Sequence, residues 1–389
     1  MIHILYSADY ELYLGRICQP EHAVLIEPTT HLLAACERLA IPLTLFADVA
    51  CLWRYREWQR ATFPAQAEAQ LVEAIRRGHD VQTHLHPHWT HARLEDNRYI
   101  FQPEHYLAGT FSPDPQERHH LIRGWLQRAS DYLTTLLAPH VPADTPAYRC
   151  LAFRAGGYGL QPDANRLLQL LRETGYRIDS SIIPGARIAS SVQQVDFSNV
   201  PAAGNYWLSH ESGLTTPAPW GSGLFEIPIA AHRLTPGERF RVRAPQALRQ
   251  AVAILTRHAP PPPRGEACNA PPPLSTPTNR MKLAYWRATA ILANDFQRLE
   301  LGTDLQALLT CFNGHVATAR RHNPTAPLFV SLNIHPKGIH PAHLKTLAEF
   351  HHTLLKRHPG QIRAITFQQA WAILQQYATG STPAHHTLS

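Results

Sequence analysis

The chain lacks the features that mark several classes of protein. Its six cysteines form no Cys-x-x-Cys and no close pair, which favours reduced, buried thiols over a disulfide framework. No segment reaches the roughly 18 unbroken apolar residues that a membrane span needs, so no transmembrane segment is expected. The N-terminus shows no basic leader with an apolar stretch and a cleavage site. These absences predict a cytoplasmic protein.

Charge of either sign forms no long run. The formal net charge is +7 and the pI is near 9.2, but the basic residues are scattered. Because no nucleic-acid module is recognisable, no nucleic-acid partner is expected, and the excess suggests at most a weak attraction for anionic ligands. Most of the 25 histidines occupy ordinary helical or loop positions, so a functional interpretation is kept for those at strand ends.

Strand-like and helix-like segments alternate along the chain. Strands are predicted at 2–8, 41–47, 80–85, 150–153, 176–183, 328–334 and 362–366. Helices are predicted from residue 29 or 30 onward and at 65–77, 115–138, 162–173, 341–356 and 368–377. This alternation predicts an α/β fold with a parallel sheet and helical crossovers, built as one elaborated domain over 1–378.

Three stretches depart from the alternation. Residues 186–224 are rich in Ser, Gly, Pro and aromatic residues, and we expect an ordered insert near the mouth of a site. Residues 259–279 form a proline-rich excursion of flexible or polyproline-like character. The tail 379–389 is predicted to be disordered.

Polar clusters follow four of the predicted strands, at 7–11, 84–88, 153–159 and 333–336. In a barrel of alternating strands and helices, the carboxyl ends of the strands converge on one face. Residues far apart in sequence can therefore assemble there into a single site.

The first two clusters offer metal ligands. Asp9 and Glu11 are two residues apart, so in extended backbone they point to the same side, although a solvated loop would also explain them. His84, His86 and His88 alternate with Leu85 and Pro87, which directs three imidazoles one way. Buried imidazoles need partners, and mixed nitrogen and carboxylate ligands favour a divalent ion, above all zinc. The proline at 87 could turn one histidine elsewhere.

The other two clusters allow two interpretations each. Arg154 precedes a glycine-rich turn, which could bind an anion, or the arginine could form a structural ion pair with a catalytic carboxylate. His335 ends a hydrophobic strand and could be a catalytic acid or a structural histidine. Trp89, Tyr158, Trp207 and Trp220 are candidates to stack on a sugar ring, with core packing as the alternative.

The order and spacing of these motifs resemble those of the NodB-homology polysaccharide deacetylases, the carbohydrate esterase family 4 type. The matching segments are 9–11, 41–46, 78–88, 153–159, 175–181 and 332–335. The resemblance implies a distorted (β/α)7 barrel of the NodB type with loop insertions and a divalent metal. Glu11 and His84 would be ligands together with His88, for which His86 is a rival.

Carried over position by position, the resemblance also assigns catalytic roles. Asp9 would be the general base, Arg154 would orient Asp9, and His335 would be the general acid. Gly157 and Tyr158 would bind substrate in the glycine-rich turn. The chain departs from the family pattern in having glutamate rather than aspartate at 11 and no proline after the arginine.

The function expected from these residues is metal-assisted hydrolysis of an N-acyl group, most simply N-acetyl, on an amino sugar. For a cytoplasmic enzyme the substrate would be a polysaccharide or lipopolysaccharide precursor, such as a nucleotide-linked or lipid-linked sugar or an oligosaccharide. Two alternatives are hydrolysis of another non-peptide C–N bond, as in a deformylase or amidase, and a non-catalytic carbohydrate-binding relative of the fold.

Overall fold

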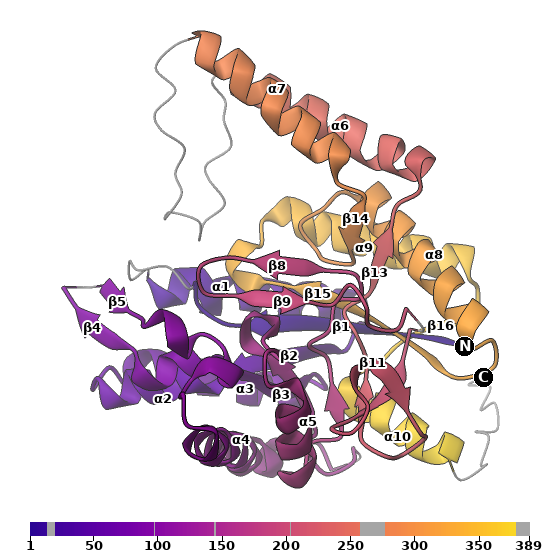
Figure 1. The fold of residues 1–389 in the computed structure, drawn as a ribbon. Helices are drawn as coiled ribbons and strands as arrows, with labels where there is room; N and C mark the ends of the chain where they lie inside the picture. The colour runs from indigo at the N-terminus through magenta and orange to yellow at the C-terminus, as the bar shows by residue number, and fades with distance from the viewer. Residues whose placement is uncertain (14–19, 97, 144, 203, 257–276, 379–389) are drawn as a thin grey trace.

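The computed structural model describes residues 1–13, 20–96, 98–143, 145–202, 204–256 and 277–378 (Figure 1). Its main sheet has ten strands, with the order β11-β10-β12-β7-β6-β3-β2-β1-β15 and with β16 paired to β1. The central strands are β1 (Ile2–Tyr10), β2 (Leu43–Asp48), β3 (Asp80–Leu85), β6 (Ala152–Ala155), β7 (Ile178–Asp179), β12 (Leu224–Glu226) and β15 (Leu328–Ile334), and all neighbours among them are parallel.

The backbone after β12 closes this sheet into a ring. The N–H of Ile229 donates to the carbonyl of Ile182 at 2.9 Å, beyond the end of β7. The next residue, Ala230, donates to the carbonyl of Ser331 in β15 at 3.0 Å. The same segment therefore joins β7 on one side and β15 on the other. The predicted distorted (β/α)7 barrel is confirmed, with an irregular seam between β12 and β15.

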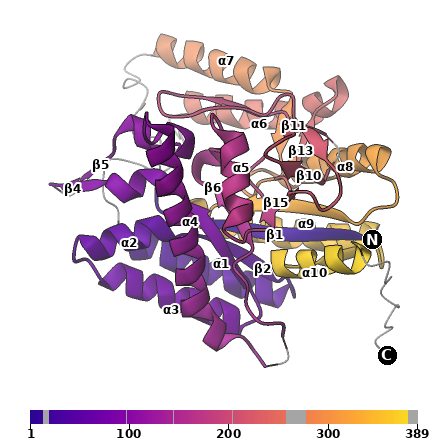
Figure 2. The same ribbon diagram turned by 60° about the horizontal axis from the view of Figure 1, so that its bottom comes forward.

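Helices surround the barrel, and one pair projects from it (Figures 1 and 2). The helices are α1 (Glu27–Arg38), α2 (Val49–Glu57), α3 (Thr62–Arg76), α4 (Pro115–Leu137), α5 (Ala164–Glu173), α6 (Pro236–Leu255), α7 (Pro277–Ala293), α8 (Leu305–His322), α9 (Pro341–Arg357) and α10 (Phe367–Ala378). None of the helices in the described part of the chain combines the length and apolar character that a membrane crossing requires.

The central strands are buried on both faces, as expected for parallel strands covered by helices. Every residue of β1 and of β15 is buried. Burial of this kind explains why these strands read as continuous apolar runs in the sequence. It also means that a polar residue within or just beyond them must find its partners inside the barrel.

The remaining strands are short. They are β4 (Arg93–Glu95), β5 (Arg98–Ile100), β8 (Arg187–Ala189), β9 (Gln194–Asp196), β10 (Tyr206–Ser209), β11 (Gly213–Ala218), β13 (Ala231–Arg233), β14 (Phe296–Arg298) and β16 (Ile362–Ala364). The insert 186–224 thus contains the β8–β9 hairpin and two strands that extend the main sheet. The sequence did not predict α2, α6, α7 or α8. The proline-rich excursion lies outside the described residues except for 277–279, which begin α7, and the tail 379–389 lies outside them entirely.

Candidate metal centre and catalytic site

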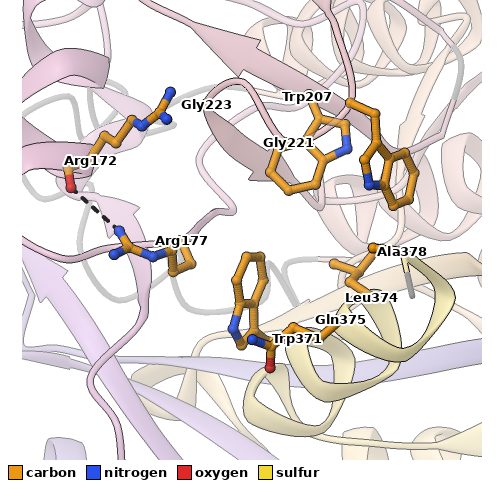
Figure 3. A pocket seen from close by; sticks show the side chains of 10 residues that line it. Arg172, Arg177, Trp207, Gly221, Gly223, Trp371, Leu374, Gln375 and Ala378 are labelled. Carbon is orange, nitrogen blue, oxygen red and sulfur yellow. Dashed lines mark hydrogen bonds between the residues drawn. The ribbon is translucent and has the colours of Figure 1, made fainter.

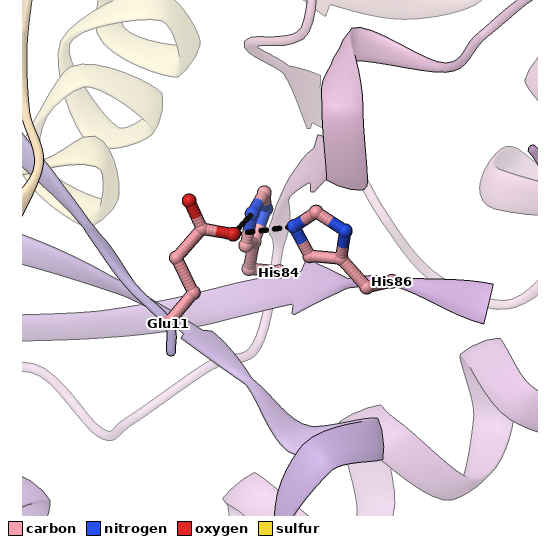
Figure 4. Close-up of side chains that lie close together, drawn as sticks. All are labelled: Glu11, His84 and His86. Carbon is pink, nitrogen blue, oxygen red and sulfur yellow. Dashed lines mark hydrogen bonds and ion pairs between the residues drawn. The ribbon is translucent and has the colours of Figure 1, made fainter. Parts of the chain in front are cut away.

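Three ligand atoms from two strand ends converge at the mouth of the barrel. Glu11 follows β1, His84 lies in β3 and His86 comes directly after β3. The Oε2 atom of Glu11 lies 3.4 Å from Nε2 of His84 and 2.5 Å from Nε2 of His86 (Figure 4). All three side chains are buried, and their ligand atoms lie within 4.8 Å of one another. A carboxylate oxygen and two imidazole nitrogens gathered in this way are a donor set that can hold a small divalent ion.

The fold holds both imidazoles in place. The Nδ1–H of His84 donates to the carbonyl of Arg154 at 2.8 Å, which leaves Nε2 free as a ligand, as is usual for metal-binding histidines. The ring of His86 packs against Gly156. A Cβ atom at 156 would lie 2.5 Å from Cγ of His86, so only glycine leaves room for this ring position. The glycine-rich turn therefore helps to build the centre.

Two further groups surround the donor set. Lys337 donates from Nζ to Oε1 of Glu11 at 2.7 Å. Although burial opposes ionisation, this lysine and the nearby imidazoles hold the pKa of Glu11 well below its usual range. Asp48, at the end of β2, accepts from the backbone N–H of His86 at 3.3 Å, and burial raises the pKa of this carboxyl. Neither residue was predicted from the sequence, although Asp48 immediately follows a predicted strand and Lys337 lies two residues after His335.

His88 does not belong to this group of ligand atoms. Pro87 begins a short 3-10 helix, which turns the chain and places the His88 ring against Phe101 and Tyr106, with centroid separations of 4.6 and 4.7 Å. Neither ring nitrogen has a hydrogen-bond partner among the described residues, and burial holds its pKa well below the usual value. Of the two rivals for the third ligand position, the structure brings His86 to Glu11.

Arg154 is fully buried beneath the site and positions Asp9. Its NH1 group donates to Oδ1 of Asp9 at 2.6 Å and to Oδ1 of Asn333 at 2.8 Å. Its remaining donors go to Oγ of Ser7 and to the hydroxyl and carbonyl of Ser180, at 2.9 to 3.0 Å. The guanidinium has no donor left for a substrate anion, so the structure supports the ion-pair interpretation over the anion-binding one.

Asp9 and His335 lie side by side. Oδ2 of Asp9 accepts from Nδ2 of Asn333 at 3.0 Å and lies 3.3 Å from Nε2 of His335. Burial opposes ionisation of Asp9, but the charge of Arg154 and the histidine contact outweigh it and hold the pKa of the carboxyl below its usual range. Asp9 is thus kept as an ionised acceptor at the barrel mouth.

Glu300 completes this arrangement. Its Oε1 atom lies 3.0 Å from Nδ1 of His335, and Arg298 pairs with its other oxygen at 2.7 Å. Burial alone would lower the pKa of His335, but the hydrogen bonds to Asp9 and Glu300 raise it to about 9. The histidine is held protonated between two carboxylates. Glu300 was missed because it lies in the irregular seam after β14, where no motif marks it.

The turn that carries Gly157 and Tyr158 lies under the insert. Gly157 has a φ of 59°, and its carbonyl accepts from Nε2 of Gln193, the residue before β9, at 2.9 Å. A side chain at 157 would collide with Gln193. Burial, and then the charge of Glu300, raise the pKa of Tyr158. Tyr158 therefore remains a neutral phenol near the acid end of the site.

The tryptophans lie elsewhere, which corrects the expectation for them. Trp89 is fully buried, with the rings of Tyr99 and Phe101 each 5.2 Å away, so it is a packing residue. Trp207 and Trp220 line a pocket together with Trp371 of α10 (Figure 3). Residues 177 and 223 of this pocket directly precede β7 and β12, at the amino ends of the strands. Glu11 and His86 follow carboxyl ends, so this pocket is separate from the metal centre.

Comparison with known proteins gives similarity of fold. No protein-family model matches the chain, and no curated protein matches it. Among solved structures, a protein from Mycobacterium smegmatis assigned as a polysaccharide deacetylase is 13% identical, with coverage of 100% of this chain and 94% of that chain and a TM-score of 0.42. A corresponding protein from Pseudomonas aeruginosa PAO1 is 14% identical, with coverage of 100% and 93% and a TM-score of 0.44.

A third similar structure, from Parabacteroides distasonis and assigned as a glycoside hydrolase/deacetylase, is 10% identical. The match covers 96% of this chain and 71% of that chain, with a TM-score of 0.48. Similarities of this size concern the path of the chain and say nothing about substrate.

Proposed function

We propose that the protein is a metal-dependent hydrolase that removes an N-acyl group, most simply N-acetyl, from an amino sugar. The observation that carries the proposal is a single cluster. An ionised Asp9 and a protonated His335 lie 3.3 Å apart, beside the Glu11, His84 and His86 donor set. A base, an acid and a cation site in contact are the parts that amide hydrolysis needs.

The donor set fits a divalent ion such as zinc. Glu11 offers an oxygen, and His84 and His86 offer Nε2 atoms whose rings are fixed by a carbonyl and by a glycine. When bound, the ion would polarise the acyl carbonyl and lower the pKa of water toward about 7. Lys337 donates to Oε1 of Glu11, so Oε2, which faces the imidazoles, stays available for the metal ion.

Asp9 is the proposed general base. Arg154 and Asn333 fix its carboxylate, so it need not reorganise when it accepts the proton of the attacking water. Proton transfer to a fixed group of this kind contributes about a hundred- to ten-thousand-fold to the rate.

His335 is the proposed general acid. Its raised pKa keeps it protonated at neutral pH, and Glu300 fixes Nδ1 so that the Nε2 proton faces Asp9 and the reacting centre. The departing amine takes this proton, since an unprotonated amine is a poor leaving group. We place substrate binding at the turn of Gly157 and Tyr158, where the phenol can donate a hydrogen bond.

We further propose that the amino sugar belongs to a polysaccharide or lipopolysaccharide precursor, with a nucleotide or lipid carrier. The net positive charge of the chain favours a phosphate-bearing substrate. This part of the proposal concerns the identity of the substrate, and the site chemistry does not depend on it.

The test is acetate release from a panel of N-acetylated substrates, with metal content measured on the same preparations. Chitooligosaccharides, a nucleotide-linked N-acetylhexosamine and a lipid-linked one cover the expected classes. Asp9→Asn should keep bound metal and lose turnover, whereas His86→Ala should lose both. His210→Ala, at an exposed position, is the control and should change neither. Bound metal with no hydrolysis of any acylamino sugar would contradict the proposal.

A further inference from the structure

The α6–α7 hairpin stands away from the barrel (Figures 1 and 2). It begins after β13 and ends before β14, and these two strands pair with each other at its base. Thr235 and Glu238 form a capping box that starts α6, so the helix begins at a defined point. The hairpin is therefore anchored to the fold at a defined base.

The hairpin exposes an unusual share of the apolar side chains. Of the twelve large hydrophobic residues that are exposed in the described part of the chain, eight lie on α6 and α7. They are Phe240, Leu248, Val252, Leu255, Met281, Tyr285, Trp286 and Leu292. Tyr285 is 74% exposed and Trp286 is 62% exposed. Exposed apolar residues gathered in this way mark an interaction surface.

Helical spacing gathers these residues into stripes. In α6 the four exposed residues recur at intervals of eight, four and three, which places them within about 120° of one another around the helix. In α7, Met281, Tyr285 and Leu292 share one face, while Trp286 lies on another side and Ala284 is buried. The two helices thus present apolar side chains over a broad part of their exposed surface.

The same helices are basic. Helix α6 carries four arginines, and α7 carries two arginines and one lysine, against a single acidic residue, Glu238. Glu238 is occupied by the cap and by His232, at 3.1 Å. Arg241, Lys282 and Arg287 are exposed. Arg249 pairs with Asp304 at 3.0 Å and Arg243 is buried, so the surface combines aromatic and aliphatic side chains with the positive charge of Arg241, Lys282 and Arg287.

We propose that the α6–α7 hairpin docks the protein onto an anionic lipid surface. Helices that lie in a membrane interface carry Trp, Phe and Leu on one side and Lys and Arg around them. A second copy of the chain is a poorer partner, because a symmetric contact would place the same basic groups against each other. Bilayer headgroups supply the opposite charge, and the acyl boundary accepts the apolar stripes.

The hairpin is joined directly to the catalytic site. β14 ends at Arg298, and Glu300, the partner of His335, comes two residues later. Docking would place the protein on the surface that holds a lipid-linked substrate. That consequence rests on the proposed function, whereas the docking itself does not.

Binding of the full-length protein to vesicles tests the proposal. Vesicles of phosphatidylcholine alone are compared with vesicles that also contain phosphatidylglycerol, at low and at high salt. We expect binding to the anionic vesicles that weakens with salt. Lys282→Ser combined with Arg287→Ser should lower the affinity about thirtyfold, since each basic residue near an anionic surface contributes about fivefold. Tyr285→Ser combined with Trp286→Ser should lower it about tenfold or more.

A matched control comes from α9, where Leu355 is 42% exposed and the side chain of Lys345 is 79% exposed. Leu355→Ser combined with Lys345→Ser should leave vesicle binding unchanged. Circular dichroism verifies folding of each variant, and quenching of tryptophan fluorescence by brominated lipid gives a second readout that Trp286→Phe should reduce.

Three results would overturn the docking proposal. They are no binding to anionic vesicles, equal binding by the hairpin variants, and a hairpin-dependent dimer or nucleic-acid complex in the absence of vesicle binding. Turnover of a water-soluble substrate should be the same in all hairpin variants. Absence of vesicle binding by the unsubstituted protein, with intact turnover, would therefore refute docking alone, and vesicle binding without turnover on any substrate would refute the proposed function alone.

Discussion

Replacing Arg154 by methionine should destabilise the protein strongly, and the structure allows the size to be worked out. Arg154 is completely buried, and its guanidinium donates to Asp9 at 2.6 Å. Methionine fills much of the same volume but leaves the buried carboxylate with His335, 3.3 Å away, in place of its bonded guanidinium. Breaking a buried ion pair from one side costs about 3–5 kcal/mol. We expect Arg154→Met to lose about 4 kcal/mol of unfolding free energy.

A double-mutant cycle separates the ion pair from simple loss of packing. Asp9→Asn alone leaves the arginine buried and unpaired, so it too should be destabilising. In the double variant neither charge remains, and the loss should be smaller than the sum of the two single losses by about 2–3 kcal/mol. Urea denaturation followed by circular dichroism measures all four proteins.

Two outcomes would refute the reasoning. A loss below about 1 kcal/mol for Arg154→Met would mean that the guanidinium is not needed to hold Asp9. Strict additivity in the cycle would mean that the two side chains do not interact in the folded protein. Metal content of the variants is measured in parallel, because a change there would report an effect on the neighbouring donor set.

Three further predictions follow from particular contacts. Gly156→Ala should weaken zinc binding by about 10- to 100-fold, because the new Cβ displaces the ring of His86. Gly124→Ala is the control and should leave zinc binding unchanged, because no atom lies within 4 Å of its new Cβ. Isothermal titration measures the zinc affinity of both variants. Glu300→Gln should slow turnover by about tenfold or more, since the protonated acid loses one of its two carboxylates; unchanged steady-state rates would contradict this. Burial lowers the pKa of His315 to about 4. The contribution of this neutral histidine to stability is therefore full above about pH 6.5 and falls by about 3 kcal/mol as the pH approaches 4. His315→Met should flatten that part of the stability–pH curve.

The strands and their polar ends could be predicted because burial on both faces leaves a simple signal. β15 was predicted with its observed bounds because a largely apolar run ends there at polar residues. β3 was predicted with its observed bounds because it lies between the glycine that stops the preceding helix and the histidine cluster. The meeting of Glu11 with His84 followed from the rule that parallel strands present their carboxyl ends together. Neither prediction required the structure of the loops.

The choice between His86 and His88 depends on contacts that no local pattern contains. Pro87 turns the chain into a 3-10 helix, and the position of the His88 ring is then fixed by Phe101 and Tyr106, which come from a later loop. The requirement for glycine at position 156 also depends on a contact that is distant in sequence, the one with the ring of His86. Such packing against distant segments decides which imidazole reaches the carboxylate.

Glu300 and the projecting helices were missed for a different reason. Glu300 lies in the seam that closes the barrel, where the backbone makes isolated bridges rather than a strand of several residues. Helices α6 and α7 flank a proline-rich stretch, and Pro245 lies inside α6, where proline disfavours a helix. Their exposed apolar stripes have no counterpart in the burial pattern that identifies ordinary helices.

The central claim is that Glu11, His84 and His86 hold one divalent ion beside Asp9. Anomalous diffraction at the zinc absorption edge, from crystals soaked in zinc, tests it most directly. We expect one strong peak in the anomalous difference map, about 2.1 Å from Nε2 of both His84 and His86 and bonded to Glu11. A peak bonded to His88 instead of His86, or no peak near Glu11, would contradict it.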